Sequence, residues 1–365
     1  MATRDTVLQI VPHLPGTFDG VGDYALNLAR ALSVEHGIAT TFLVAGKTSA
    51  SSKDGYKVVS GLDKVGAAEL ARTHEHVILH YANYGYQPRG VPFALRRFVK
   101  RLRPQLRGRW VTMFHELYAS GGPTGSAFWL RPFQIRIAHD LIDASSCCVV
   151  SNAPIEQAIH AYDFRKAVRT IPVMSNFGEP ELIDFAAASP KRWVICGGTA
   201  LVSRSLRQFE QLLPLVPTNF APEHLDVVGG RPDPLIVAVI DRLKRGRSVH
   251  HYPEVNVDLA SEVLRQSSFG WLDYFGDGKV WPGMVLKSGA LAALCAHGVI
   301  PIVSHREESI AVDGDAVPGP FYLKPNAIRF PPPEEVPALR RRCFKWYHAH
   351  ADSRQTARIY AEALR

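Results

Sequence analysis

Short β-rich runs alternate with helical stretches along the first half of this chain, and this alternation constrains the fold more than any other feature. The runs are continuously apolar instead of alternating between apolar and polar residues, which is typical of parallel strands covered by helices on both faces. They are VLQIVP (7–12), TTFLVAG (40–46), HVILHY (76–81), RWVTMFHE (109–116), ASSCCVVSN (144–152) and VRTIPVMSN (168–176). The sequence therefore predicts a doubly wound α/β domain.

The same pattern starts again after residue 190, with KRWVICGG (191–198), HLDVVGG (224–230), SVHHYP (248–253), SFGWLDYFG (268–276) and VIPIVS (299–304). A chain of 365 residues exceeds the size at which one core stops growing. We therefore expect two Rossmann-like, doubly wound parallel-sheet domains, 1–176 and 191–333, facing a cleft. Residues 177–190 are the expected linker, and 334–365, which follow three prolines, are expected to form a helical tail that packs back on the first domain.

Composition narrows the functional classes. No apolar run approaches the roughly 18 to 20 residues that span a bilayer, and the N-terminus has no signal-peptide pattern, so we expect a cytoplasmic protein. Five cysteines without a CxxC pair indicate reduced, buried thiols. The net charge of +8 favours anionic partners, which include nucleic acid, acidic lipid and sugar nucleotides. Charge alone does not choose among them.

The segment TFDGVGDYALNLARALS (17–33) directly follows the first apolar run. Gly20 and Gly22 permit a tight turn and a close backbone approach before a helix. That helix would present its N–H groups at the carboxyl end of the sheet, where an anion is favoured. The spacing is not the dinucleotide GxGxxG pattern, and a purely structural turn is the alternative. The apolar face of the helix is formed by Ala25, Leu28, Ala29 and Leu32.

This segment resembles the glycine loop and first helix of family 4 glycosyltransferases, which have the GT-B fold. The resemblance continues in order through VTMFHE (111–116), VVSN (149–152), SNFGEP (175–180), ICGGTALVSRS (195–205), LDVVGG (225–230) and ALCAHGVIPIVS (293–304). It implies an enzyme that moves a sugar from a nucleoside-diphosphate sugar to a hydroxyl acceptor with retention of configuration. The resemblance also implies that no metal is required. No cofactor is expected, since the sugar nucleotide is a co-substrate.

The resemblance assigns roles to individual residues. His115 matches a histidine that faces the donor sugar. Arg204 falls where the family presents a lysine to the donor diphosphate, and a guanidinium can replace it as a phosphate clamp. Thr199 falls where the family has an arginine, so one positive charge is missing unless Arg207 or another basic residue supplies it. The alternatives are a structural histidine and a solvated arginine.

The clearest departure from the family lies in FGDGKVWPGMVLKSGALAALCAHG (275–298). The family's two glutamates fall on Val285 and Ala293, which cannot accept hydrogen bonds through their side chains. Instead, Lys287, Ser288 and Gly289 stand at an expected helix start, with Ser288 as its N-cap. Lys287 and the N–H groups there are expected to bind the donor diphosphate. The alternative is a simple cap beside a solvated lysine.

The remaining candidates are less specific. Donor phosphate contacts are expected from the glycine segment as well, at Gly20, Val21 and Gly22. Metal ligands are not expected, because no DxD-type carboxylate pair stands in a metal-binding setting. Contacts to the acceptor or to sugar hydroxyls are expected from Asp23, Tyr24, Glu116, Asp273 and Asp277.

The stretch RRFVKRLRPQLRGR (96–109) mixes basic and apolar residues and has no acidic residue. Such a stretch can contact the inner face of an anionic membrane, where lipid-linked acceptors lie, or can be an ordinary surface helix. The acceptor is thus expected to be a saccharide or a lipid-linked molecule. Nucleic acid is not an expected partner, because no base-reading motif is present. The alternative function is a GT-B protein that binds a nucleotide or glycan without catalysing transfer; a sugar-nucleotide epimerase ranks below it.

Overall fold

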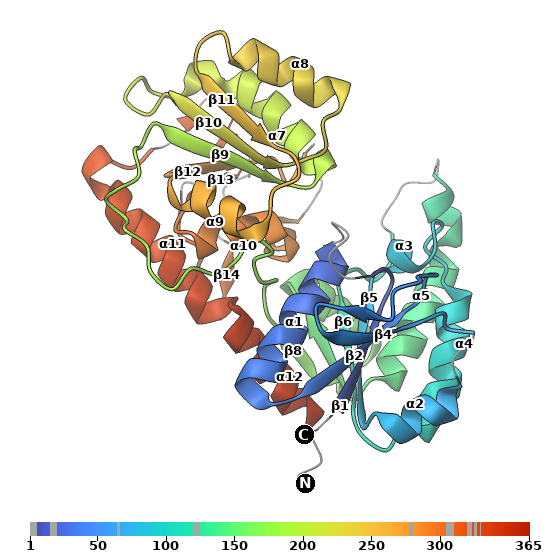
Figure 1. Ribbon diagram of the computed structural model, residues 1–365. Helices are drawn as coiled ribbons and strands as arrows, with labels where there is room; N and C mark the ends of the chain where they lie inside the picture. The colour runs from blue at the N-terminus through green and yellow to red at the C-terminus, as the bar shows by residue number, and fades with distance from the viewer. Residues whose placement is uncertain are drawn as a thin grey trace. The chain divides into compact units, whose positions relative to one another are not determined.

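The computed structural model describes residues 6–14, 20–63, 66–119, 125–276, 281–303, 310–319, 323–324, 327–328 and 330–365. The chain forms two compact α/β units (Figure 1). Unit 1 consists of Met1–Ile171 together with Ser353–Arg365, and unit 2 of Pro172–Asp352. Residues 177–190, the expected linker, thus belong to unit 2, and Ser353–Arg365 belong to unit 1.

The sheet of unit 1 has the order β3-β4-β2-β1-β5-β6-β7-β8. All neighbouring strands are parallel except the edge pair β3 and β4, which is antiparallel. The strands are β1 (Thr6–Val11), β2 (Ala39–Val44), β3 (Ser52–Lys53), β4 (Tyr56–Ser60), β5 (His76–Tyr81), β6 (Trp110–Phe114), β7 (Cys147–Val150) and β8 (Val168–Thr170).

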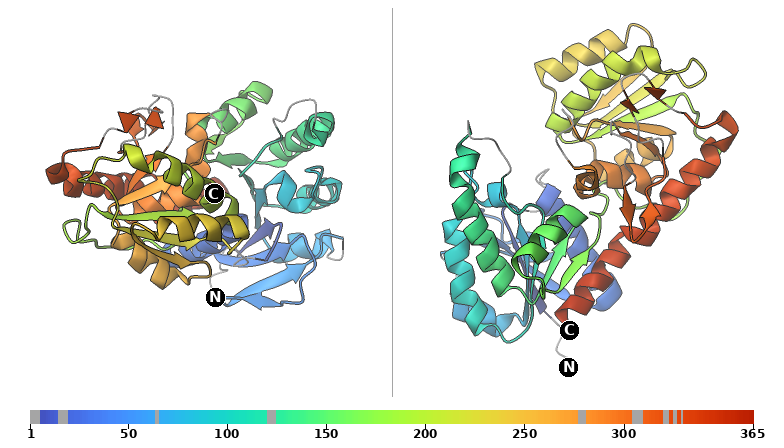
Figure 2. Two further views of the ribbon diagram at one scale, coloured as in Figure 1. Left: turned by 90° about the horizontal axis from the view of Figure 1, so that it is seen from above. Right: turned by 180° about the vertical axis from the view of Figure 1, so that it is seen from behind.

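Helices cover both faces of this sheet, as Figure 2 shows from behind. They are α1 (Gly20–His36), α2 (Ala67–Thr73), α3 (Asn83–Tyr86), α4 (Phe93–Leu102), α5 (Ser126–Ala144), α6 (Ala153–Tyr162) and α12 (Ser353–Leu364), with a 3-10 turn at Arg103–Gln105. Ala25 and Leu26 of α1 pack with Phe42 and Val44 of β2. Leu43, between those two, points to the opposite face and joins the core under α2, α4 and α5. Continuous apolar strands are therefore needed, because both sides of each strand are buried.

Unit 2 contains an all-parallel sheet of order β11-β10-β9-β12-β13. This order reverses direction between β9 and β12, which is the topological switch point where doubly wound sheets bind ligands. The strands are β9 (Arg192–Gly197), β10 (His224–Gly229), β11 (Ser248–Tyr252), β12 (Phe269–Leu272) and β13 (Ile300–Val303). The helices are α7 (Thr199–Leu212), α8 (Pro234–Leu243), α9 (Val257–Arg265), α10 (Gly289–Ala296) and α11 (Val336–His350), with 3-10 turns at Leu213–Leu215, Pro282–Lys287 and Pro333–Glu335. Two small hairpins are formed by β14 (Ala311–Val312) with β15 (Asp315–Ala316) and by β16 (Leu323–Lys324) with β17 (Ala327–Ile328).

The predicted fold class is confirmed, and each predicted apolar run contains a strand. Two local expectations are corrected. Helix α1 already begins at Gly20, so Gly20 and Gly22 form its first turn instead of a loop before it. The predicted helix after residue 334 is two helices, because Ala351 adopts φ −137° and ψ −6°, outside the helical region.

All five cysteines are buried and free, as expected. Among the described residues, no helix combines the length and apolarity needed to span a membrane.

Arg340 holds three segments of unit 2 together from a fully buried position. Its guanidinium donates to the carbonyl oxygens of Gly298 (3.0 Å), Phe185 (2.9 Å) and Arg265 (3.0 Å). Burial lowers the pKa of Arg340 to about 10, so the side chain is still charged at neutral pH. These hydrogen bonds offset the free-energy cost of burying the charge, so the loss of donors at this position should be destabilising.

Replacing Arg340 by Met should destabilise unit 2 by about 3 to 5 kcal/mol, because three carbonyl groups, one of them fully buried, lose their donor. In thermal unfolding this corresponds to a decrease of about 10 °C in Tm. Arg342→Met removes the same charge from an exposed position of the same helix and should shift Tm by no more than about 1 °C. Equal shifts for the two variants would contradict this role of Arg340.

Candidate functional site

Two helix N-termini meet where β9 ends in unit 2. Gly197, the last residue of β9, has φ +133°, and a Cβ placed there would lie 3.0 Å from Leu201 of α7 and 3.4 Å from Ala290 of α10. Helix α7 begins one residue after Gly198, which has no side chain to cap it. Helices α7 and α10 therefore both begin beside the carboxyl end of β9, and the N-terminus of a helix favours an anion.

The turn after β10 is held against this point. Gly229 has φ +84°, and a Cβ placed on it would lie 2.4 Å from the carbonyl oxygen of Gly197, so only glycine fits. Nε2 of His251 lies 3.0 Å from the carbonyl oxygens of both Gly229 and Gly230. Since both partners only accept hydrogen bonds, His251 donates from Nε2 and fixes the turn.

The hydroxyl of Thr199, at the start of α7, accepts a hydrogen bond from the backbone N–H of Arg231 (3.0 Å). The side chain of Arg231 is exposed, and within the described part of the chain its guanidinium has no hydrogen bond or ion pair. Arg231 thus lies beside the position where the family resemblance lacks an arginine. The sequence left the missing charge to Arg207 or another basic residue and did not single out Arg231. The sequence feature that could have identified Arg231 is its position directly after Gly229 and Gly230, where β10 ends.

Arg204 lies on α7 and reaches the loop that follows β12. Its guanidinium donates to the carbonyl oxygens of Asp273 (3.1 Å) and Tyr274 (3.5 Å), and Ser205 Oγ accepts from the N–H of Asp273 (3.0 Å). Arg204 therefore positions this loop as well as adding positive charge. Asp273 Oδ1 accepts from the N–H of Gly276 (3.0 Å), so this carboxylate, expected to contact a sugar, shapes the turn. Asp277 lies outside the described residues.

The start of α10 carries a second group of predicted residues. Ser288 is its N-cap as predicted, because its Oγ accepts from the N–H of Leu291 (3.3 Å). A Cβ on Gly289 would lie 3.4 Å from the amide nitrogen of Asn176, which places the SNFGEP segment at this helix start. Lys287 is partly exposed, and within the described part of the chain its ammonium group has no partner.

The two positions that are glutamates in the family lie in the apolar core. Val285 and Ala293 are both fully buried. No carboxylate therefore replaces the ribose-binding glutamate from these positions.

Arg207, the other basic candidate on α7, donates from Nε to the carbonyl oxygen of Ser203 (3.3 Å). Among the described residues, no group of three or more histidine, cysteine, aspartate or glutamate side chains has a metal-binding arrangement.

In unit 1, His115 follows β6 and lies among buried aromatic rings. Its Nε2 is 3.4 Å from Nδ1 of His80, and the ring of Tyr24 packs edge-on against both imidazoles, with centroids 5.1 and 5.8 Å away. Tyr24 is buried and its hydroxyl donates to that of Tyr360 (3.4 Å), so it joins α1 to α12 and is not placed to contact a sugar. Glu116 follows His115 and is partly exposed.

The glycine segment forms the first turn of α1. Gly20 is exposed, Val21 and Asp23 are partly exposed, and Gly22 is buried. The predicted residues thus form two groups. One surrounds the end of β9 in unit 2 and the other lies at α1 and β6 in unit 1.

A line of buried polar side chains fixes the tautomer of His115. Nε2 of the fully buried His80 lies 2.8 Å from Gln9 Oε1, and Gln9 Nε2 donates to Thr40 Oγ1 (3.5 Å). Burial, and then the neighbouring His115, hold the pKa of His80 well below its usual value, so the ring is neutral. Since Gln9 Oε1 can only accept, the single proton of His80 is on Nε2, and its Nδ1 accepts from His115 Nε2–H. His115 therefore carries its proton on Nε2. Sequence reasoning missed Gln9 and His80, although both are polar residues within apolar runs.

Several solved structures share this fold. An α-glucosyltransferase in complex with UDP and a 13-mer DNA containing an HMU base is 11% identical, with a TM-score of 0.63 over 99% of this chain and 100% of that chain. TarM is 8% identical, with a TM-score of 0.61 over 100% and 99%. The E. coli trehalose-6-phosphate protein bound with UDP-2-fluoro glucose is 9% identical, with a TM-score of 0.58 over 99% of each chain. The chain has the GT-B fold of these glycosyltransferases.

No protein-family model and no curated protein matches the sequence. The expectation that nucleic acid is not a partner is at odds with the α-glucosyltransferase structure, which contains DNA.

Gln9→Glu should reverse the tautomer of His115. A carboxylate next to His80 Nε2 stabilises the imidazolium form, which then donates from Nδ1 and obliges His115 Nε2 to accept. Ring ¹⁵N chemical shifts of His115 at neutral pH should therefore show its proton moving from Nε2 to Nδ1.

Thr40→Val removes only the hydrogen bond from Gln9 Nε2 to Thr40 Oγ1 and should leave the tautomer of His115 unchanged. A His115 ring that stays protonated on Nε2 in the Gln9→Glu variant would refute the assigned order of donors.

Proposed function

We propose that the protein is a glycosyltransferase that moves a sugar from a nucleoside-diphosphate sugar to a hydroxyl acceptor. The observation that carries this proposal is that α7 and α10 both begin beside the end of β9, with Arg231 held at the start of α7 and Lys287 directly before the N-cap of α10. Structural relatives that are glycosyltransferases in complex with UDP add support. The close backbone approach of Gly229 to Gly197 holds the turn after β10 against the start of α7, at the edge where doubly wound sheets bind phosphate groups.

The proposed diphosphate site stabilises the leaving group. As the glycosidic bond breaks, negative charge accumulates on the departing phosphate oxygen, and fixed positive charge lowers the barrier. Lys287 and Arg231 supply mobile charges, while Arg204 is held in place by the loop after β12. Thr199, Ser288 and Gly289 stand at the helix starts whose N–H groups complete the site.

The proposed reaction retains the anomeric configuration. The departing phosphate oxygen takes the proton of the acceptor hydroxyl on the face from which it leaves, while charge stabilisation comes from side chains and helix dipoles and no metal ion is invoked. His115, with its proton on Nε2 directed to His80, orients the sugar. Gly20, Val21, Gly22, Asp23 and Glu116 are proposed to contribute further contacts at the first turn of α1 and the end of β6. Five free cysteines suit a reducing compartment, which is why we place the reaction in the cytoplasm.

The acceptor is a saccharide, a lipid-linked molecule or a hydroxylated base of a nucleic acid. The last class is added because one relative was solved with DNA containing an HMU base. Each class offers a hydroxyl group, which is all that the proposed chemistry requires of it.

One observation favours a second candidate function, a protein that binds a nucleotide sugar without transferring it. The buried Val285 and Ala293 leave no carboxylate where the family resemblance expects two. Binding of a nucleotide sugar without turnover on any of the three acceptor classes would favour this candidate.

Arg231→Ala and Lys287→Ala should each lower kcat/KM for the nucleotide sugar by about a hundredfold, because each removes a charge from the leaving diphosphate. Arg245→Ala provides the matched control, since Arg245 is an exposed arginine in the turn before β11, at the opposite edge of the sheet. Steady-state transfer assays measure the effect. Normal rates in both variants would remove these residues from the site.

His115→Ala should lower the transfer rate by about a hundredfold while preserving nucleotide affinity, because it misplaces the sugar without changing the diphosphate site. Affinity is measured by thermal shift against UDP-, GDP-, ADP- and TDP-sugars, where ligand at one hundred times its Kd adds about 2.7 kcal/mol of stability. His139→Ala, on α5, is the control histidine substitution. A rate equal to that of the unaltered protein would return His115 to a structural role.

A further inference from the structure

Exposed aromatic side chains gather at the N-terminal ends of α4 and α5 in unit 1. On α5, Phe128, Trp129 and Phe133 are 38%, 70% and 52% exposed, and Phe93 at the start of α4 is 45% exposed. The rings form two edge-on pairs, with centroids 6.2 Å apart for Phe93 and Phe133 and 5.4 Å apart for Phe128 and Trp129. These four residues, which we call the aromatic cluster, form an apolar surface of the kind that marks an interaction site.

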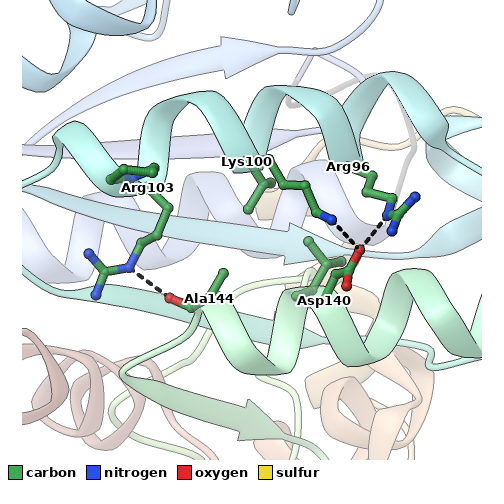
Figure 3. A pocket seen from close by; sticks show the side chains of 8 residues that line it. Arg96, Lys100, Arg103, Asp140 and Ala144 are labelled. Atoms are coloured by element: carbon green, nitrogen blue, oxygen red, sulfur yellow. Dashed lines mark hydrogen bonds and ion pairs between the residues drawn. The ribbon is translucent and has the colours of Figure 1, made fainter.

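A basic groove continues from the aromatic cluster along the same two helices. Figure 3 shows α4 and α5 side by side, with Arg96 and Lys100 both directed at Asp140. Arg136 approaches the same carboxylate to 3.7 Å, and Arg103 donates to the carbonyl oxygen of Ala144 (2.8 Å). One carboxylate therefore faces three cations, and positive charge remains uncompensated. The groove encloses about 210 Å³.

The charge of the surrounding segments has the same sign. Residues 83–105 and 125–144 contain eight lysine and arginine residues and two aspartates. The apolar residues of the stretch 96–109, Phe98, Val99, Leu102 and Leu106, are buried in the core of unit 1. That stretch can therefore offer only its charges to a membrane, and the apolar contribution has to come from the aromatic cluster.

Aromatic rings beside lysine and arginine are the combination that anionic lipid surfaces recognise. Tryptophan and phenylalanine enter the boundary between head groups and acyl chains, and basic residues bind the lipid phosphates. Single-stranded nucleic acid also binds aromatic and basic residues, but it uses ring faces that stand apart and stack with successive bases. In this cluster the rings pack edge-on in two pairs, and Trp129 and Phe133 lie one turn apart on α5, which favours insertion into an apolar layer over stacking with bases.

We propose that unit 1 docks on an anionic phospholipid bilayer, with the aromatic cluster at the acyl boundary and the basic groove on lipid phosphate groups. This binding depends on the surface alone and not on the proposed sugar transfer. It assigns a role to the exposed aromatic residues of α4 and α5 and to the cations around Asp140.

Co-sedimentation with vesicles tests the proposal. The unaltered protein should bind phosphatidylcholine vesicles that contain about one-third phosphatidylglycerol, and binding should weaken as salt is raised. Trp129→Ser should reduce the partition coefficient by about tenfold, and Arg136→Glu by about fivefold or more. Both positions are exposed, so the fold should not be affected, and circular dichroism checks this.

Trp281→Ser is the matched control, because Trp281 is 71% exposed against 70% for Trp129 but lies in unit 2. Its partition coefficient should equal that of the unaltered protein. The proposal is overturned if Trp129→Ser binds vesicles normally, if Trp281→Ser loses as much binding, or if pure phosphatidylcholine vesicles bind equally well. Binding to an oligonucleotide but to neither kind of vesicle would also overturn it. Loss of vesicle binding with normal transfer to a water-soluble acceptor would separate docking from the reaction.

Discussion

The candidate site of unit 2 depends on the close approach of two strand ends. The Cα of Gly229 faces the carbonyl oxygen of Gly197 so closely that a Cβ would lie 2.4 Å from it. Because of this approach, the turn after β10 lies against the start of α7, and Arg231 reaches Thr199. At the same time, the absence of a side chain on Gly197 leaves room for the start of α10. Backbone geometry at two glycines thus brings together the turn after β10 and the starts of α7 and α10, which are far apart in the sequence.

In unit 1, buried polar side chains determine the orientation and tautomer of one histidine at a strand end, His115. A glutamine and a histidine buried in neighbouring strands cost free energy unless all their donors and acceptors are paired. Here the amide of Gln9 accepts from His80 and donates to Thr40, so the order of protons is determined along the line. As a result, His115, at the other end of this chain of hydrogen bonds from Thr40, has one defined tautomer. Polar groups that would weaken an ordinary core therefore have a directional role in this one.

The strands, the fold class and the cap at Ser288 were predictable because they depend on residues adjacent in sequence. Continuous apolar runs identify buried parallel strands, and a serine before a helix identifies a cap. The partner of Thr199 was not predictable, because it required knowing that β10 lies beside β9. Gln9 and His80 are 71 residues apart and meet only because β1 pairs with β5. The hairpin of β3 and β4 was missed because its strands are short and partly polar. The contacts between Arg231 and Thr199 and between Gln9 and His80 therefore depend on the order of strands in the sheets, which the sequence pattern does not give.

The membership of Ser353–Arg365 in unit 1 affects how the protein is made. Tyr360 pairs with Tyr24 across 336 residues of chain, and everything in unit 2 lies between them. During translation the first sheet and α1 emerge long before α12, so the apolar side of α1 that α12 later covers stays open while unit 2 is synthesised. Unit 1 therefore cannot finish folding in the order of synthesis, and a nascent chain stalled within unit 2 would carry an unfinished first unit that chaperones could bind.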